Sequence, residues 1–268
     1  MAVQKIVVFL LLVFSLPHFG QESTASPQVQ SFTLEATQLQ TTKKIWLYLP
    51  KDYTQSKQHY PVIYMPDGQN LFDAKTSYVG EWKIDETLDS LNAQVIVVGI
   101  EHGGEKRLEE LTPFPNAKYG GGKGDAYLVF LVQTLKPYID SHYRTKTNAK
   151  NTAIFGSSLG GLMAFYASIK YPDVFGKVGC FSPAFWINRE PLNQLLAATK
   201  EYKARIYLLC GDQEGDEDMV KDMQATEYWI NTQRCSCKKM NKSVIIKGGQ
   251  HNEKLWSVQF EKAYLWLF

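Results

Sequence analysis

The segment from Gly156 to Gly160 has the residue types and the spacing of a nucleophilic serine. Its sequence, GSSLG, fits the pattern G-x-S-x-G, in which a serine occupies a sharp turn between a strand and a helix. Glycines are needed there because side chains at the flanking positions would collide with the neighbouring strand and helix. If Ser157 were the nucleophile, the pattern would require a small residue at position 155, where Phe155 stands. The register therefore predicts Ser158 as the nucleophile.

His251 is the candidate general base. A serine hydroxyl is a weak nucleophile until a neighbouring base takes its proton, and chains with this serine turn place the base late in the sequence. His251 is the only histidine after Ser158, and it follows an apolar run at residues 243–246. We therefore expect His251 on a loop at the C-terminal edge of a sheet, facing Ser158.

A carboxylate completes such a triad, because it accepts the imidazole N–H and stabilises the imidazolium. The candidates follow an apolar run at residues 204–210. We select Glu214, three residues after Gly211 at the tip of a turn, because the later acids resemble the acidic first turn of a helix. The residues among which the choice stays open are Asp212, Glu214, Asp216, Glu217 and Asp218.

Two backbone N–H groups are expected to form an oxyanion hole. One belongs to Leu159, the residue after the nucleophile, and the other to the loop at residues 66–70. Gly68 allows that loop to turn tightly and leaves the N–H of Gln69 free to point at the developing negative charge. An ordinary Asp-Gly turn is the alternative interpretation, and the local sequence favours neither.

The surrounding pattern predicts the elements that position these residues. Alternating apolar residues at 31–35 and 44–49 indicate antiparallel edge strands, whereas continuous apolar runs indicate parallel strands buried on both faces. These runs lie at 62–65, 95–98, 153–155, 178–181, 206–209 and 244–246. Helical spacing between strands predicts a doubly wound α/β fold. The predicted helices are 81–91, 126–139, 159–170, 216–230 and 252–267.

The longest stretch expected to be irregular is residues 101–123, which is rich in glycine and charged residues. Loops of this length inside a compact domain are usually functional, and this one follows the C-terminal end of a predicted strand. We therefore expect it to form a wall of the substrate site. Aromatic residues in predicted loops are candidates for lining that site, namely Phe72, Tyr78, Trp82, Phe114, Tyr119 and Trp186.

The N-terminal residues have the order typical of a secretory signal peptide. Lys5 precedes an apolar run at residues 6–16, and a polar stretch at 21–26 follows. The run is shorter than the roughly 20 apolar residues that span a bilayer. We therefore assign residues 1–25 to a signal peptide, with cleavage after Gly20 as an alternative, and expect a secreted or periplasmic protein.

Composition indicates one domain and names no macromolecular partner. The 268 residues are 44% hydrophobic, which is enough for a single large core over residues 26–268. The formal net charge is +2 without long runs of one sign, so we expect neither nucleic acid nor a membrane surface as a partner. The cysteine spacing matches no zinc or thioredoxin-like pattern, and no metal or organic cofactor is expected. The four cysteines, whose pairing stays open, are Cys180, Cys210, Cys235 and Cys237.

Four short segments together resemble the putative esterase family of α/β-hydrolases. They are MPDGQNLF at 65–72, GSSLGG at 156–161, SP at 182–183 and GQHN at 249–252. That family includes siderophore, feruloyl and acetylxylan esterases, S-formylglutathione hydrolases and mycolyltransferases. The resemblance implies an α/β-hydrolase fold with a mostly parallel central sheet, helices on both faces and antiparallel N-terminal edge strands.

The resemblance also implies a function. A triad of Ser158, His251 and Glu214, with oxyanion donors Gln69 and Leu159, implies a serine carboxylic-ester hydrolase that forms an acyl-enzyme. The expected partner is a small-molecule or glycan ester: an acylated sugar, a hydroxycinnamoyl ester or a siderophore lactone. The alternatives are an acyltransferase with the same triad and an inactive binding module of the same fold.

Overall fold

The computed structural model describes residues 22–215, 218–232 and 240–268. In this part of the chain the strands form one sheet in the order β1-β2-β4-β3-β5-β6-β7-β8. Most of the predicted signal peptide, the acids Asp216 and Glu217, and the cysteines Cys235 and Cys237 lie outside the described residues.

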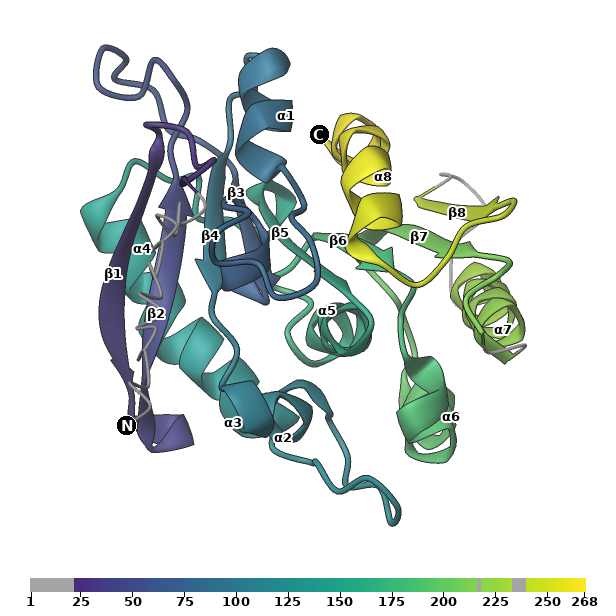
Figure 1. Ribbon diagram of the computed structural model, residues 1–268. Helices are drawn as coiled ribbons and strands as arrows, with labels where there is room; N and C mark the ends of the chain where they lie inside the picture. Colours follow the sequence, from purple (N-terminus) through teal and green to yellow (C-terminus); the bar gives the residue numbers. More distant parts are fainter. Residues whose placement is uncertain (1–21, 216–217, 233–239) are drawn as a thin grey trace, which may run out of the picture.

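The sheet is mostly parallel. Strands β1 and β2 pair antiparallel with each other, β2 pairs antiparallel with β4, and the remaining neighbours are parallel. The antiparallel pair forms one edge of the sheet, as Figure 1 shows in purple. The strands are β1 (Val29–Ala36), β2 (Thr41–Tyr48), β3 (Val62–Pro66), β4 (Ile96–Ile100), β5 (Thr152–Ser157), β6 (Lys177–Phe181), β7 (Arg205–Gly211) and β8 (Asn241–Ile246).

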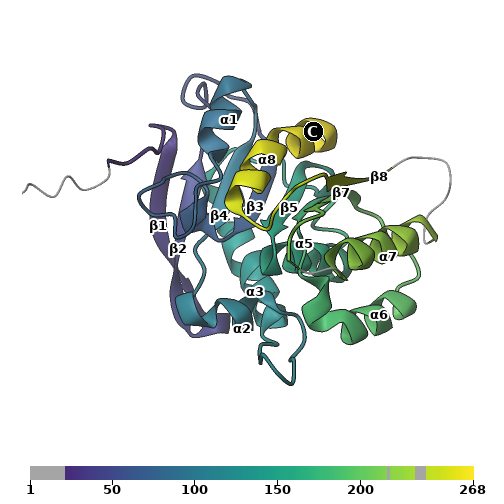
Figure 2. The same ribbon diagram turned by 45° about the vertical axis from the view of Figure 1, so that its right-hand side comes forward.

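Helices cover both faces of the sheet (Figures 1 and 2). They are α1 (Ile84–Ser90), α2 (Arg107–Leu111), α3 (Gly124–Phe130), α4 (Lys136–His142), α5 (Leu159–Lys170), α6 (Arg189–Ala198), α7 (Asp218–Thr232) and α8 (Glu253–Leu267). Helices α1 and α8 pack on one face, and their apolar residues share a core cluster with Ile63 and Met65 of β3. The other helices bury their apolar residues on the opposite face, against Val62 and Tyr64 of the same strand. Neighbouring residues of one strand thus serve two cores, because side chains alternate across a strand.

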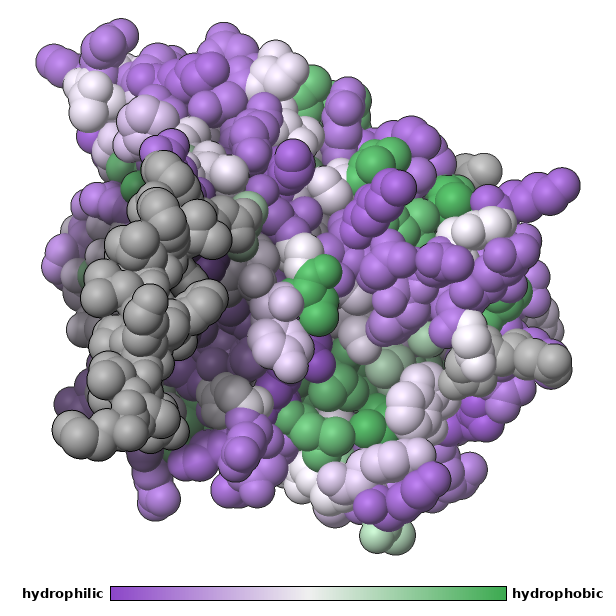
Figure 3. All heavy atoms as spheres, in the orientation of Figure 1, coloured by the Kyte–Doolittle hydropathy of each residue, from purple (hydrophilic) through white to green (hydrophobic). Residues whose placement is uncertain are grey.

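These features confirm the predicted α/β-hydrolase fold class, including the antiparallel edge strands at the N-terminus. No helix in the described ranges has both the length and the apolar character that a membrane crossing requires. Figure 3 shows that the face seen in Figure 1 is largely hydrophilic, with a hydrophobic area below α5, between α3 and α6.

Two local predictions were wrong in part, and one helix was missed. The segment 101–123 is not irregular throughout, because Arg107–Leu111 consists of good helix formers and folds as α2. Helix α6 was not predicted, although its buried Leu192 and Leu196 have helical spacing. The predicted helix 126–139 is interrupted by a π-helical turn at Leu131–Leu135, next to Pro137, which has no N–H to donate.

Candidate active site

Ser158 lies in the turn between β5 and α5, at the end of a central strand. Its φ of 55° and ψ of −120° are unusual for a residue with a side chain, and its N–H donates to the carbonyl of Phe181 at 2.9 Å. A Cβ on Gly156 would lie 2.4 Å from the carbonyl oxygen of Gly160. The strained turn therefore depends on glycine at position 156, as the sequence pattern predicted.

His251 and Glu214 lie side by side, although 37 positions separate them in the sequence. Nδ1 of His251 is 2.9 Å from Oε2 of Glu214. The Glu214 side chain is 0% exposed, whereas that of His251 is 30% exposed. A carboxylate at Nδ1 places the ring hydrogen there and leaves Nε2 as the proton acceptor. The pair has the geometry of a general base and the acid that orients it.

The other candidate acids have different partners. Oδ1 of Asp212 accepts a hydrogen bond from the N–H of Gly248 at 2.6 Å. Asp218 pairs with Arg189 at 3.2 Å, at the start of α7. Among the described candidates, Glu214 is the one whose carboxylate contacts His251.

Ser182 and Trp256 hold the Glu214 carboxylate from behind. The hydroxyl of Ser182 donates to Oε1 of Glu214 at 2.6 Å and accepts from Nε1 of Trp256 at 2.8 Å. The N–H of Gly211 also donates to Oε1. The Trp256 ring stands nearly perpendicular to the His251 ring, at 88° and a centroid distance of 5.1 Å. Neither role could be predicted from the sequence, although Ser182-Pro183 is one of the segments that resemble the esterase family.

Ser158 and His251 line the same cavity, which has a volume of about 900 Å³. Gln69, from the loop after β3, lines it as well. Leu159 is the first residue of α5, and Gln69 is the second residue of a one-turn helix at Gly68–Asn70. The N–H groups of residues at such positions have no carbonyl to bond within their own helix. The structure thus brings three of the five predicted site residues to one cavity, namely Gln69, Ser158 and His251. Leu159 follows Ser158 in the chain, and Glu214 lies behind His251.

The loop that carries Gln69 contacts strand β4 through Gly68 and helix α2 through Asp67. A Cβ on Gly68 would come within 2.7 Å of the carbonyl carbon of Gly99 in β4, so this close approach requires glycine. Asp67 has a left-handed φ of 61°, and its carboxylate binds Arg107 of α2 through two hydrogen bonds of 2.7 and 2.8 Å. Bidentate pairs of this kind fix orientation as well as distance.

The segment 101–123 forms part of the cavity wall, as predicted, through His102, Gly104, Glu105 and Arg107. Burial lowers the pKa of His102. Its Nδ1 accepts a hydrogen bond from the N–H of Gly104 at 2.9 Å, which requires that nitrogen to be unprotonated.

The aromatic predictions were largely wrong. Of the six candidates only Tyr78 lines the cavity, where Trp256 supplies a second ring. Phe72 and Trp82 are 1% and 2% exposed and belong to the core. Phe114 packs against Tyr166, and Tyr119 packs against Trp186. The two described cysteines, Cys180 and Cys210, are buried and unpaired.

Comparison with known proteins decides the family. A family model described as "Putative esterase" matches residues 36–267. The chain belongs to the putative esterase family. It is accordingly an esterase, and the resemblance noted in its sequence is confirmed.

Relatives of this esterase include characterised and uncharacterised proteins. The uncharacterised protein YbbA of Bacillus subtilis is 28% identical over 238 residues, which are 84% of this chain and 92% of that protein. An endo-1,4-beta-xylanase/feruloyl esterase of Xylanibacter ruminicola is 27% identical over 209 residues, 74% of this chain but 26% of that longer protein. The solved structure of the enterobactin esterase FES from Shigella flexneri superposes with a TM-score of 0.70 at 18% identity, covering 91% of this chain and 60% of that one.

Proposed function

We propose that this esterase hydrolyses carboxylic esters by two-step acyl transfer, with Ser158 as nucleophile, His251 as general base and Glu214 as the acid that orients it. The observation that carries the proposal is the 2.9 Å contact between Nδ1 of His251 and the buried carboxylate of Glu214. The location of Ser158 and His251 in one cavity supports it.

In the first step, Oγ of Ser158 attacks the ester carbonyl carbon while Nε2 of His251 takes the hydroxyl proton. The tetrahedral intermediate collapses, the bond to the leaving oxygen breaks, and His251 gives its proton to the departing alcohol. Water then attacks the acyl-enzyme with the same base, which releases the acid and restores Ser158. Glu214 stabilises the imidazolium in both steps.

The N–H groups of Leu159 and Gln69 are the proposed donors to the oxyanion. Preorganised donors of this kind are worth about 3–4 kcal/mol each in related acyl-transfer sites. The ion pair between Asp67 and Arg107 holds the Gln69 loop in place before substrate arrives. This reduces the reorganisation that would otherwise accompany charge development.

For the substrate we propose a polar ester that carries a ring, with an acylated sugar, a hydroxycinnamoyl ester and a siderophore lactone as the candidates. The cavity combines the rings of Tyr78 and Trp256 with the charged side chains of Glu105, Arg107 and Glu253. The similarity to a protein named as a feruloyl esterase supports the hydroxycinnamoyl group among these. Flat rings and a few placed polar groups are the usual means of binding such ligands.

The test is a hydrolysis assay on these three ester classes, each with and without a sugar acceptor. We expect free acid as the main product in both conditions and no turnover by Ser158→Ala. A new ester as the main product when the acceptor is present would make the protein an acyltransferase. No turnover and no acylation of Ser158 with any ester class would indicate an inactive binding module.

We also propose that the protein is secreted or periplasmic, with its signal peptide cleaved after Gly20 rather than after Ala25. Ser23 and Thr24 both bond to the carboxylate of Asp73, at 2.7 and 3.1 Å. Residues with such contacts behave as part of the catalytic domain and not as a removable leader. Intact-mass analysis of protein recovered after export tests this: a first residue of Gln21 supports the proposal, and a first residue of Ser26 contradicts it.

A further inference from the structure

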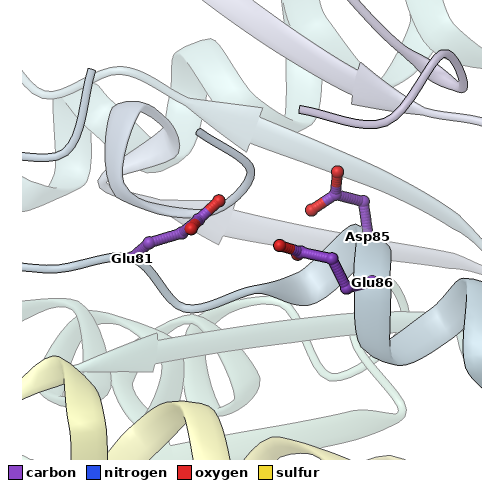
Figure 4. Close-up of side chains that lie close together, drawn as sticks. All are labelled: Glu81, Asp85 and Glu86. Carbon is purple, nitrogen blue, oxygen red and sulfur yellow. The ribbon is translucent and has the colours of Figure 1, made fainter. Parts of the chain in front are cut away.

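Three carboxylates converge beside α1, on Glu81, Asp85 and Glu86. One oxygen from each lies within 4.8 Å of the oxygens chosen from the other two. Figure 4 shows the carboxylates of Glu81 and Glu86 directed into the space between them, with that of Asp85 beside them. None of the three lines the catalytic cavity.

The spacing suits one kind of cation. Oxygen ligands lie 2.3–2.6 Å from Ca²⁺, so two ligands of one ion are at most about 5 Å apart. The shorter Mg²⁺ distance limits the same separation to about 4.2 Å. The three oxygens lie within 4.8 Å of one another, so every separation is within the calcium limit, whereas the magnesium limit is met only if the separations are shorter than that bound.

Asp85 provides a second observation that is independent of this convergence. Its side chain is fully buried, at 0% exposure, yet its Oδ1 accepts no hydrogen bond within the described part of the chain. Its Oδ2 accepts from the N–H of Ser26 at 2.7 Å. Oε2 of Glu86 and Oγ of Ser26 are also buried and have no hydrogen-bond partner among the residues that the structure describes. When Asp85 and Glu86 are both ionised, their two buried carboxylate oxygens have no donor, which is costly unless a cation binds them.

Among the residues described, no lysine or arginine forms an ion pair with Glu81, Asp85 or Glu86, although Lys83 is near enough to favour the charged form of Glu81. Thr24 donates its hydroxyl to Oε1 of Glu81 at 3.0 Å, which leaves the charge in place. Burial, followed by the neighbouring Glu86, raises the pKa of Asp85 to about 7. A proton is therefore the competing occupant of the cluster near neutral pH.

We propose that Glu81, Asp85 and Glu86 bind one calcium ion, with Oγ of Ser26 as a further oxygen ligand. The ion fastens residues 23–26 to the catalytic domain, because the same segment bonds to Asp73, Glu81 and Asp85. The chain between Asp73 and Glu81 also contributes Thr76, Tyr78 and Val79 to the catalytic cavity. Calcium at this site thus restricts the motion of the segment 73–81, which forms one wall of that cavity.

The test uses protein purified from expression of the full chain, freed of metal with a chelator and held at pH 8, where a proton competes less. Isothermal titration with CaCl₂ should give one ion per chain, and millimolar CaCl₂ should raise the unfolding midpoint by several degrees. MgCl₂ at the same concentration should give a smaller shift. These readouts do not depend on esterase activity, so they separate this proposal from the proposed function.

Variants locate the site. Glu86→Gln, at a half-buried position, should weaken calcium binding at least 10-fold without lowering the midpoint of the metal-free protein. Asp85→Asn keeps an oxygen for the N–H of Ser26 and should do the same. Glu35→Gln, on the exposed side of β1, is the matched control and should bind as the unaltered protein does. Absence of binding to the unaltered protein, equal shifts with Mg²⁺, or full binding by Glu86→Gln would overturn the proposal.

Discussion

The hydroxyl of Ser182 donates a 2.6 Å hydrogen bond to Oε1 of Glu214, on the side of the carboxylate opposite the oxygen that faces His251. Trp256 can only donate to the Ser182 hydroxyl, so the hydroxyl hydrogen of Ser182 is free to bond to Glu214. Ser182 is fully buried and has a left-handed φ of 46°. Ser182 is therefore a positioning residue for the proposed triad acid, since its hydroxyl is bonded to Glu214 and Trp256 and not to a substrate.

Ser182→Ala should lower kcat by about 10-fold while KM changes little, because it removes one charge-assisted hydrogen bond from the catalytic acid. Steady-state kinetics on the best ester substrate measure both constants. Ser168→Ala is the matched control, since Ser168 is also buried and bonds to Phe165 and Tyr202 away from the cavity. Equal losses of kcat in the two variants would show that the effect is structural.

Glu214→Gln should lower kcat on the order of 10,000-fold, because an amide can donate to Nδ1 and so place the ring hydrogen on the wrong nitrogen. Asp212→Asn keeps an oxygen for the N–H of Gly248 and should stay within a few fold of the unaltered enzyme. Kinetic measurements on this pair identify the triad acid. The opposite ranking would assign the role to Asp212.

Arg107→Lys should lower kcat by about 10-fold, because a lysine cannot reproduce the two parallel hydrogen bonds to Asp67 that hold the Gln69 loop. Arg189→Lys is the control: Arg189 also pairs with a carboxylate, that of Asp222, but it does not line the cavity. Steady-state kinetics with both variants test the link between the ion pair and the oxyanion hole. An unchanged kcat in Arg107→Lys would show that the ion pair is not needed to position the Gln69 loop.

Gly156→Ala should lower the free energy of unfolding by about 3 kcal/mol or more, because the new Cβ would meet backbone that cannot move aside easily. At Gly160 the nearest atom to a new Cβ is Cγ of Pro66 at 3.1 Å, so Gly160→Ala should cost less. Chemical denaturation of both variants measures the difference. If both variants lose the same free energy of unfolding, crowding by neighbouring backbone is not the reason why position 156 requires glycine.

The sequence predicted the features that depend on local pattern. Continuous apolar runs identify the buried strands, and GSSLG fixes the turn around Ser158, because both follow from the geometry of a few consecutive residues. Glu214 was selected from its place after Gly211, and the structure puts its carboxylate at His251. Its role in catalysis stays a prediction.

Most features that depend on contacts between distant segments could not be predicted; the contact between Glu214 and His251 is an exception, because the order of nucleophile, acid and base along the chain indicates it. Ser182 and Trp256 are 74 positions apart, and no local pattern indicates that both meet Glu214. Phe72 and Trp82 lie in loops by sequence, but they fold back into the core between the sheet and α8. Loop membership says where the backbone runs and not which way an aromatic ring points.

The central claim is that His251 activates Ser158, and covalent labelling with a fluorophosphonate tests it most directly. Peptide mapping by mass spectrometry should find a single adduct, on Oγ of Ser158, and labelling should be at least 100-fold slower in folded His251→Ala. An adduct on Ser157, or labelling of Ser158 at the same rate without the imidazole, would contradict the account.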